Sequence, residues 1–215
     1  MKPVLKIDWA THEAAKYACE NWHYSKSIPK SKLVKIGAWE NERFIGVVIF
    51  SYGATPQIGS PYNLKQIQVC ELTRIALNKH NVYVSKILSI AIRFLKKANP
   101  GLRLIVSFAD TEQNHHGGIY QATNWIYAGT FGGGTRVGWF IKGRKTHTRT
   151  VGSMPGGVQS TEWVRKNLDP KAKEWIGKDK HRYLMPLDSE MRKQILPLSR
   201  PYPKRAQSIE NDAAG

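Results

Sequence analysis

The sequence predicts an α/β (α+β) protein with a mixed central β-sheet flanked by helices and a C-terminal extension. Over residues 4–143, strand and helix patterns follow the order strand, helix, three strands, helix, strand, helix, strand, strand. A chain of 215 residues is long enough for one core and an appendage. We therefore expect a core over residues 1–146 and a basic extension over residues 147–215 packed on it, with a tail that loses order after about residue 203.

The elements of the N-terminal half follow from apolar periodicity and turn residues. Thr11 precedes a helical pattern and is a suitable N-cap. Gly and Pro residues recur over residues 53–64, which is typical of a loop. We expect a strand at 4–10, a helix at 11–25, strands at 27–40 and 43–54 joined by a turn at Glu40–Glu42, a loop at 53–64 and a strand at 67–77.

The clearest helix of the chain is predicted over residues 84–98. Val84, Ile87, Leu88, Ala91 and Leu95 share one face, and Pro100-Gly101 ends the pattern. After it we expect a buried strand at 102–109, a short helix at 118–125 and strands at 125–131 and 135–143. In the extension we expect helices at 160–167 and 189–196 and a strand at 181–187.

The charge indicates a polyanionic partner. Lys and Arg number 33 against 16 Asp and Glu, a net charge of +17 with a pI near 9.9. Such a field attracts nucleic acid, although soluble proteins can also simply be basic. No apolar run approaches the roughly 18 residues of a membrane helix, and no signal-peptide pattern opens the chain, so we expect a cytoplasmic protein. Cys19 and Cys70 are expected to be buried, reduced thiols.

The segment 107–129 holds an unusual number of reactive groups. Asp110 follows a buried strand at its C-terminal end, the edge where open α/β sheets bind ligands. It could act as a base, ligate a metal or merely cap the next turn. His115 and His116 lie in a Gly-flanked loop and suit proton transfer or cofactor contact, the alternative being a solvated pair. Tyr120 could serve as an acid or orient a donor, or could be a core tyrosine.

Two further segments combine cations with groups that recognise nucleotides. His23 and Tyr24 end the first helix, before a loop that carries Lys26, Lys30 and Lys32; an aromatic ring among cations suits a splayed nucleotide, and a solvated loop is the alternative. The pattern at residues 142–149 predicts a loop whose cations contact successive phosphates of a nucleic-acid backbone. A solvated run of charges is the alternative. The cations are Lys142, Arg144, Lys145 and Arg149.

Arg74 lies three residues after Glu71 in a predicted strand. On a regular strand the two side chains face opposite sides, which leaves Arg74 able to reach a phosphate, a carboxylate or an amide. A surface ion pair is the alternative.

These motifs resemble a known family. GIYQATNWIYAGT resembles the late helix and strand of the N-acetyltransferase (GNAT) superfamily. Together, ENWHYSKSIP, CELTRIAL, SFADTEQNHHGGIYQATNWIYAG and HRYLMPL resemble the Mom family of bacteriophage DNA-modification proteins, over roughly Trp9 to Leu187. The resemblance implies a GNAT-like enzyme that converts adenine in DNA to an N6-carbamoylmethyl form and protects phage DNA from restriction. It places His23, Tyr24, Arg74, Asp110 and Tyr120 at functional positions, and implies iron held by His23 and Asp110.

The donor of the added group stays open. GNAT enzymes hold the CoA pyrophosphate on a Gly-rich loop that opens their main helix. Residues 77–89, LNKHNVYVSKILS, contain no glycine, which argues against acetyl-CoA. Ser85 could cap this helix and Lys86 could meet a phosphate, so both are candidate cofactor-binding residues together with His115 and His116.

Three functions therefore compete. The first is a DNA adenine-modifying transferase acting on double-stranded DNA with the target base flipped out. The second is a CoA-dependent acetyltransferase acting on an amine or a protein. The third is a non-catalytic DNA-binding protein, which has no use for a histidine-rich loop after Asp110. A homodimer is compatible with all three, and none requires a membrane.

Overall fold

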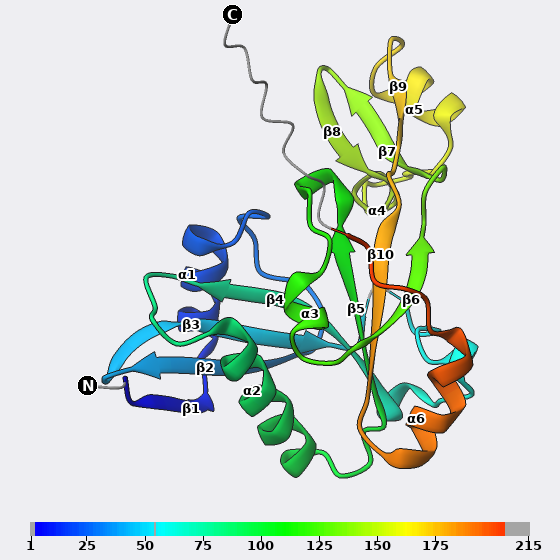
Figure 1. Ribbon diagram of the computed structural model, residues 1–215. Helices are drawn as coiled ribbons and strands as arrows, with labels where there is room; N and C mark the ends of the chain where they lie inside the picture. The colour runs from blue at the N-terminus through cyan, green and yellow to red at the C-terminus, as the bar shows by residue number, and fades with distance from the viewer. Residues whose placement is uncertain (1–2, 54, 205–215) are drawn as a thin grey trace, which may run out of the picture. The chain divides into compact units, whose positions relative to one another are not determined.

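The computed structural model describes residues 3–53 and 55–204, drawn in colour in Figure 1. These residues form two compact units. The first unit contains residues 3–109, except 54, with residues 115–129 and 181–204, and the second contains residues 110–114 and 130–180. The predicted division at residue 146 stays a prediction. The tail predicted to lose order lies, from residue 205 on, outside the described residues.

A seven-stranded mixed sheet is the centre of the first unit. Its neighbours β1 to β4 pair antiparallel, whereas β4 and β5 pair parallel. This confirms the predicted mixed sheet, and the strand predicted at 181–187 is its sixth member in space. In spatial order the strands are β1 (Leu5–Trp9), β2 (Leu33–Glu40), β3 (Arg43–Ser51), β4 (Val69–Leu77), β5 (Leu104–Asp110), β10 (Lys180–Pro186) and β6 (Ile126–Phe131).

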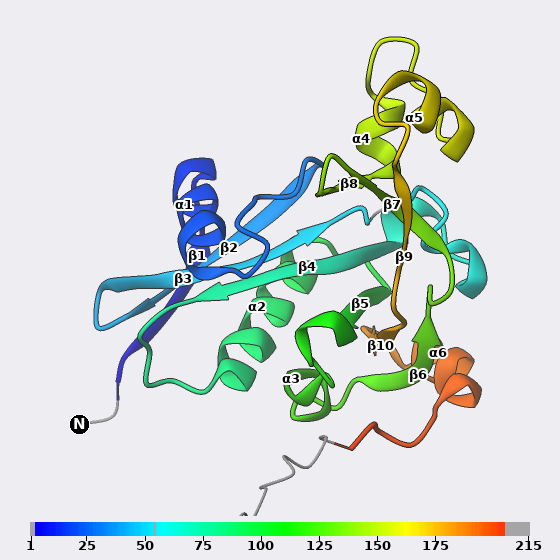
Figure 2. The same ribbon diagram turned by 90° about the horizontal axis from the view of Figure 1, so that it is seen from above.

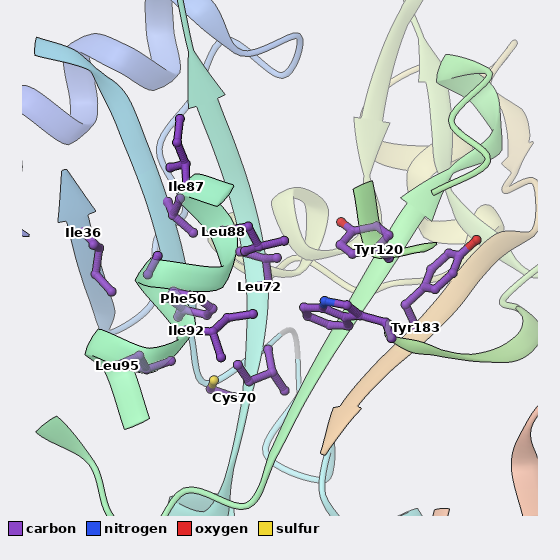
Figure 3. Close-up of a cluster of buried hydrophobic side chains, with 14 of the residues drawn as sticks. Ile36, Phe50, Cys70, Leu72, Ile87, Leu88, Ile92, Leu95, Tyr120 and Tyr183 are labelled. Atoms are coloured by element: carbon purple, nitrogen blue, oxygen red, sulfur yellow. The ribbon is translucent and has the colours of Figure 1, made fainter. Parts of the chain in front are cut away.

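Two helices cover opposite faces of this sheet, as Figure 2 shows. Helix α1 (His12–Trp22) begins as predicted, with the Thr11 hydroxyl accepting a hydrogen bond from the Ala14 N–H at 3.1 Å. Helix α2 (Val84–Ala98) has the predicted bounds. Its apolar face packs on the strands in the largest core cluster, which contains Ile87, Leu88 and Leu95 of α2 together with residues of the sheet (Figure 3). Burial of these faces is the main stabilising contribution to the unit.

Shorter elements complete the first unit. Helix α3 (Gly118–Gln121) is shorter than predicted and ends at residue 121, because Asn124 adopts a left-handed φ of 59° before β6. Helix α6 (Ser189–Ile195) confirms the predicted C-terminal helix and packs Met191 and Ile195 against the sheet. Single turns of 3₁₀ helix occupy Ser60–Tyr62, Gln66–Gln68 and Leu196–Leu198.

The second unit contains a three-stranded antiparallel sheet in the order β8–β7–β9. The strands are β7 (Arg136–Ile141), β8 (Arg144–His147) and β9 (Lys173–Ile176). Helices α4 (Thr148–Gly152) and α5 (Thr161–Asn167) supply Val151 and Val164 to a small core around the fully buried Trp139. A 3₁₀ turn at Thr111–Gln113 also belongs to this unit.

The interpretation of residues 142–149 as a loop was wrong. Only Lys142 and Gly143 form a turn, with φ of 48° and 77°; the next four residues are β8 and the following ones begin α4. β8 has the sequence RKTH, which lacks an apolar alternation, so its strand character arises from pairing with β7.

The structure confirms the expectation for the two cysteines. Cys19 and Cys70 are both buried and free. In the part of the chain that the structure describes, no helix is long and apolar enough to cross a membrane.

Candidate functional site

The first unit gathers several of the predicted residues where α1 ends. His23 is the C-cap of α1 and is 8% exposed. Its ring lies 4.3 Å from that of Tyr24, measured between centroids, and the Tyr24 ring meets the His115 ring edge-on at 5.5 Å. Of the two adjacent histidines, His115 therefore reaches this cluster of rings. The His116 backbone carbonyl instead accepts a hydrogen bond from the Tyr183 hydroxyl at 2.5 Å.

His23 is held in its neutral form. The Ser25 N–H donates to the His23 Nδ1 at 3.1 Å, and the Ser25 Oγ lies 2.8 Å from the same atom. A nitrogen that accepts from a backbone N–H carries no proton, so the proton of the neutral ring lies on Nε2. Burial lowers the pKa of His23 to about 4, and electrostatic interactions with Arg74 and His115 act in the same direction. Near pH 7 the ring is an uncharged hydrogen-bond donor through Nε2.

On a regular strand the side chains of Arg74 and Glu71 would point to opposite faces. In the structure they point to the same face. In the β3–β4 register, Glu71 lies opposite Ser51 and Arg74 lies opposite Ile49, so a β-bulge leaves Thr73 as an extra residue. Because positions 49 and 51 share one face of β3, Glu71 and Arg74 share one face of β4. The prediction was wrong because the bulge breaks the alternation.

The bulge also directs the Arg74 guanidinium. Its Nη1 donates to the Thr73 carbonyl at 2.7 Å. Its Nε is buried and has no hydrogen-bond partner among the described residues. An unpaired buried donor is costly, and at a cluster of polar groups it is a candidate contact for a ligand oxygen.

Strands β4 and β5 separate beside this cluster. They pair only at Val69–Glu71 and Leu104–Val106, and then point apart (Figure 1). Ser107 sits where they separate. Its Oγ lies 2.8 Å from the Leu72 carbonyl oxygen and 2.8 Å from the Tyr120 hydroxyl. Since a carbonyl only accepts, the single Ser107 hydroxyl hydrogen goes to Leu72 and Tyr120 donates to Ser107.

Tyr120 is thereby fixed and uncharged. It is buried beside Trp125 and Tyr183, at ring distances of 5.0 and 4.8 Å. Burial raises the pKa of Tyr120 to about 12, and the electrostatic effects of Tyr24, Glu71 and Tyr183 add to the rise. Its position depends on Gly117, the N-cap of α3, which has φ of 82°. A Cβ at residue 117 would lie 2.3 Å from the Tyr183 ring.

The cluster thus contains His23, Tyr24, Arg74, His115 and Tyr120. Ring contacts join His23, Tyr24 and His115, and electrostatic effects connect Arg74 with His23 and Tyr24 with Tyr120. Sequence reasoning missed Ser25 and Ser107, which fix the hydrogens of His23 and Tyr120. Ser25 lies two residues after His23 and could have been noticed as a local partner. Ser107 lies within an apolar strand, and the only signal in the sequence is that a polar residue occurs in that apolar run.

Asp110 belongs to the second unit. Its Oδ1 accepts a hydrogen bond from the Glu112 N–H at 3.0 Å, and its Oδ2 lies 3.8 Å from the Lys180 Nζ. The capping of the next turn, one alternative from the sequence, is therefore observed. A catalytic role for Asp110 stays a prediction.

A carboxylate of the chain itself occupies the loop ahead of α2. Glu40, 2% exposed, accepts hydrogen bonds from the Asn81 and Val82 N–H groups at 2.9 and 2.8 Å. Burial raises the pKa of Glu40, but these N–H groups and the Asn81 amide outweigh it and lower the pKa below the ordinary value. Two successive backbone N–H groups are a typical anion site, and here the anion is Glu40.

The N-cap of α2 is Tyr83, without a side-chain cap, and Ser85 is already inside the helix. The expectation that Ser85 caps α2 was wrong, because the helix begins at Val84, two residues earlier than a Ser85 cap requires. Ser85 and the exposed Lys86 lie in its first turn, and a contact of either with a cofactor stays a prediction.

The predicted phosphate-binding cations are exposed in both units. In the first, Lys30 and Lys32 are exposed, whereas Lys26 donates from Nζ to the Asn21 carbonyl at 3.1 Å. In the second, Lys142 occupies the turn, Arg144 and Lys145 lie on β8, and Arg149 begins α4.

Metal binding finds little support in the donor set. Across residues 3–53 and 55–204, no three His, Cys, Asp or Glu side chains gather as metal ligands. His23 already uses Nδ1 to accept a hydrogen bond from the Ser25 N–H, so its Nε2 carries the proton and does not offer a lone pair to a metal. The residues described do not supply a set that fits iron, and iron held by His23 and Asp110 stays a prediction.

Comparisons with known proteins agree with this architecture. A sequence profile of the Mom protein family matches residues 4–204. The methylcarbamoylase Mom of Escherichia phage Mu is 24% identical over 208 residues, which cover 93% of this chain and 84% of that protein.

Solved structures show the same fold. An aminoglycoside acetyltransferase in complex with coenzyme A superposes with a TM-score of 0.50 and 10% identity, covering 89% of this chain and 98% of that one. The same values hold for that enzyme with coenzyme A and kanamycin. The predicted GNAT-like fold is therefore confirmed, and at this identity the likeness concerns the fold alone.

Proposed function

Because this chain belongs to the Mom protein family, we propose that it is a transferase that converts adenine in DNA to N6-carbamoylmethyladenine and so protects phage DNA from restriction. The observation that carries the proposal is the cluster of His23, Tyr24, Arg74, His115 and Tyr120 beside the separating strands β4 and β5. A non-catalytic DNA-binding protein would not need a fixed neutral histidine, an unpaired guanidinium N–H and a buried tyrosine in one place.

The cluster positions reactants rather than removing a proton by itself. With the His23 Nδ1 engaged by Ser25, the Nε2–H can donate to an acceptor atom of adenine or of the donor. The Arg74 Nε–H is available to the oxygen of an amide or a carboxylate. The exocyclic amine of adenine is a poor nucleophile, because its lone pair is delocalised into the ring. Tight positioning of the two reactants should therefore supply much of the rate.

Tyr120 serves as a fixed hydroxyl. With its pKa near 12 it stays protonated at neutral pH, and its hydrogen is directed at Ser107. Its oxygen lone pairs remain available to accept a hydrogen bond from a reactant amine or amide. We propose that Tyr120 orients the reactant in this way.

Asp110 is the candidate base for the proton that leaves the adenine amine during transfer. Asp110 is the last residue of β5, and its two oxygens already have partners, the Glu112 N–H and the Lys180 Nζ. A base role requires the Lys180 contact, at 3.8 Å, to give way when substrate binds.

DNA is the substrate that the charge favours. The net charge of +17 attracts the phosphate backbone, and Lys30, Lys32, Lys142 and Arg149 are exposed cations on two units. The adenine amine lies inside the duplex, so the base must flip out to react.

We propose that the donor does not bind through a pyrophosphate group at the loop before α2. The Asn81 and Val82 N–H groups that such an anion would use already bind the Glu40 carboxylate, and a second anion there would be repelled. Acetyl-CoA-dependent transfer is the alternative that the fold supports. A concentration-dependent rise in melting temperature with coenzyme A would favour it.

The proposed function is tested by mass spectrometry of nucleosides from the DNA of bacteria that express the chain. We expect a new adenosine-derived species whose mass corresponds to the carbamoylmethyl group, absent with empty vector and strongly reduced in Asp110→Ala. Unmodified adenine in cells with abundant folded protein would contradict the proposal.

A further inference from the structure

The three-stranded sheet of the second unit has one face packed on helices and one open face. Cross-strand neighbours point to the same side of a sheet. Trp139, on the packed face, lies opposite Thr146 and Glu174. Phe140 therefore points to the other side, where its neighbours are Lys145 on β8 and Lys173 on β9. One step along, Gly138 lies between His147 and Trp175 on this open face.

Phe140 is an exposed aromatic ring at the centre of this face. It lies on the middle strand, yet 38% of it is accessible. A lysine stands on each side of it, and both lysines are exposed. Phe140 therefore presents an accessible aromatic ring between two cations.

Aromatic and cationic groups are already in contact on this face. The Lys145 Nζ lies 4.5 Å from the centroid of the Trp175 ring, and the Trp175 ring meets His147 edge-on at 6.5 Å. No Asp or Glu of the three strands points to this side, since Glu174 lies on the packed face, where it binds Arg136. The nearest acid is Glu112, whose carboxylate lies 3.4 Å from the Lys145 Nζ.

We propose that this open face binds a DNA strand, with an unpaired base stacked on Phe140 and the flanking phosphates on Lys145 and Lys173. The proposal rests on the proposed function in taking DNA as the partner. A base presents an apolar π face and a phosphate a negative charge, and the open face offers the complementary groups in neighbouring positions. Flipping of the target adenine leaves unpaired bases nearby, so such a surface would have a ligand during the reaction.

The test measures binding of a fluorescein-labelled 12-nucleotide single strand by fluorescence anisotropy, using the full chain. Phe140→Ala should weaken binding about 5- to 150-fold, the range for loss of one stacked base, and Phe140→Tyr should retain it. Ile176→Ala removes another exposed apolar side chain of the same sheet and is the matched control. Equal affinities for the wild type, Phe140→Ala and Ile176→Ala would overturn the proposal, provided that their melting temperatures agree.

The lysines give a second, independent readout. The double variant Lys145→Ala with Lys173→Ala should reduce the slope of log affinity against log salt by about 1.4 on a single strand. The control Lys166→Ala with Lys171→Ala removes the same charge from exposed positions of the same unit and should change the slope less. Equal slopes in both double variants would overturn the assignment of phosphates to this face.

These outcomes separate the face from the proposed function. If Phe140→Ala lost binding while the wild type left adenine unmodified, the DNA-binding role of the open face would be supported. The proposed adenine modification would be refuted. Normal adenine modification with unchanged binding in Phe140→Ala would refute the face and leave the function standing. If the wild type bound no oligonucleotide at all, the proposed role of the open face in DNA binding would be refuted.

Discussion

At the scale of single residues, the hydrogen-bond partners decide what each site group can do. Ser25 fixes the tautomer of His23, and Ser107 directs the hydrogen of Tyr120. The sequence could propose His23 and Tyr120 as functional groups, because their residue types and the family resemblance pointed there. The protonation state of His23 could not be predicted, because it depends on burial and on Arg74, which lies far along the chain.

The first prediction concerns the titration of His23. Its pKa, near 4 in the folded protein, is below the 6.5 of an exposed histidine, so the unfolded chain binds more protons between these values. His23 therefore contributes stability that is present above pH 6.5 and is lost as the pH falls toward 4, about 3 kcal/mol in all. The melting temperature of His23→Gln should fall less between pH 7 and pH 4.5 than that of the wild type.

NMR detection of the imidazole nitrogens measures the same quantity directly. Nδ1 should be unprotonated and Nε2 protonated at pH 7, and Arg74→Ala should raise the pKa of His23, because it removes a nearby positive charge. A His23 titration near 6.5 would contradict the account of its environment.

The second prediction concerns the hydroxyl of Tyr120. Tyr120→Phe removes one hydrogen bond to Ser107, which costs about 1 kcal/mol of stability, but it should lower DNA modification at least tenfold. Tyr202→Phe is the matched control, because the Tyr202 hydroxyl donates to the Trp125 carbonyl in the same unit. Equal loss of modified adenine in both variants would indicate a general stability effect instead of a role in the site.

At the scale of elements, helices that depend on nearby residues could be predicted from the sequence. Strands and bulges that depend on pairing with a distant strand could not. Helices α1 and α2 were predictable because their periodicity, the Thr11 cap and the stop at Pro100-Gly101 are encoded nearby. β8 and β9 were missed because each has four residues and no usable alternation. The bulge at Thr73 arises from pairing with β3, and it reverses the expected relation of Glu71 and Arg74.

The third prediction concerns the turn that begins α3. Gly117 and Gly129 both have φ of 82°, but a Cβ at 117 would meet the Tyr183 ring and a Cβ at 129 would meet nothing within 4 Å. Gly129→Ala should cost only the backbone strain, about 1 kcal/mol, whereas Gly117→Ala should cost at least about 2 kcal/mol more. Thermal unfolding measures the difference, and equal melting temperatures would contradict the packing described.

At the scale of the whole molecule, the net charge and the order of elements could be predicted, whereas a long-range contact could not. The net charge of +17 was legible in the composition, and the GNAT-like fold in the order of elements. The contact of Glu40 with the loop before α2 was not, because it joins residues about forty positions apart. For the proposed function, that contact argues against binding of a pyrophosphate at the loop before α2 more directly than the missing glycine does.

The fourth prediction concerns the salt dependence of binding to duplex DNA. If Lys142, Arg144, Lys145 and Arg149 each contact one phosphate, replacing all four by Ala should reduce the slope of log affinity against log salt by about 3.6. Affinities measured between 50 and 200 mM salt give this slope. An unchanged slope would place the phosphate contacts elsewhere on the chain.

The most direct test of the central claim is the amount of modified adenine in the DNA of cells that express Arg74→Ala, compared with Arg93→Ala. Both variants lose one positive charge, but Arg74 belongs to the cluster at the separating strands and Arg93 is an exposed residue of α2. Nucleoside mass spectrometry should find the modified base reduced at least a hundredfold in Arg74→Ala and unchanged in Arg93→Ala, with equal amounts of folded protein. Modification that persists in Arg74→Ala would contradict the assignment of the reaction to this cluster.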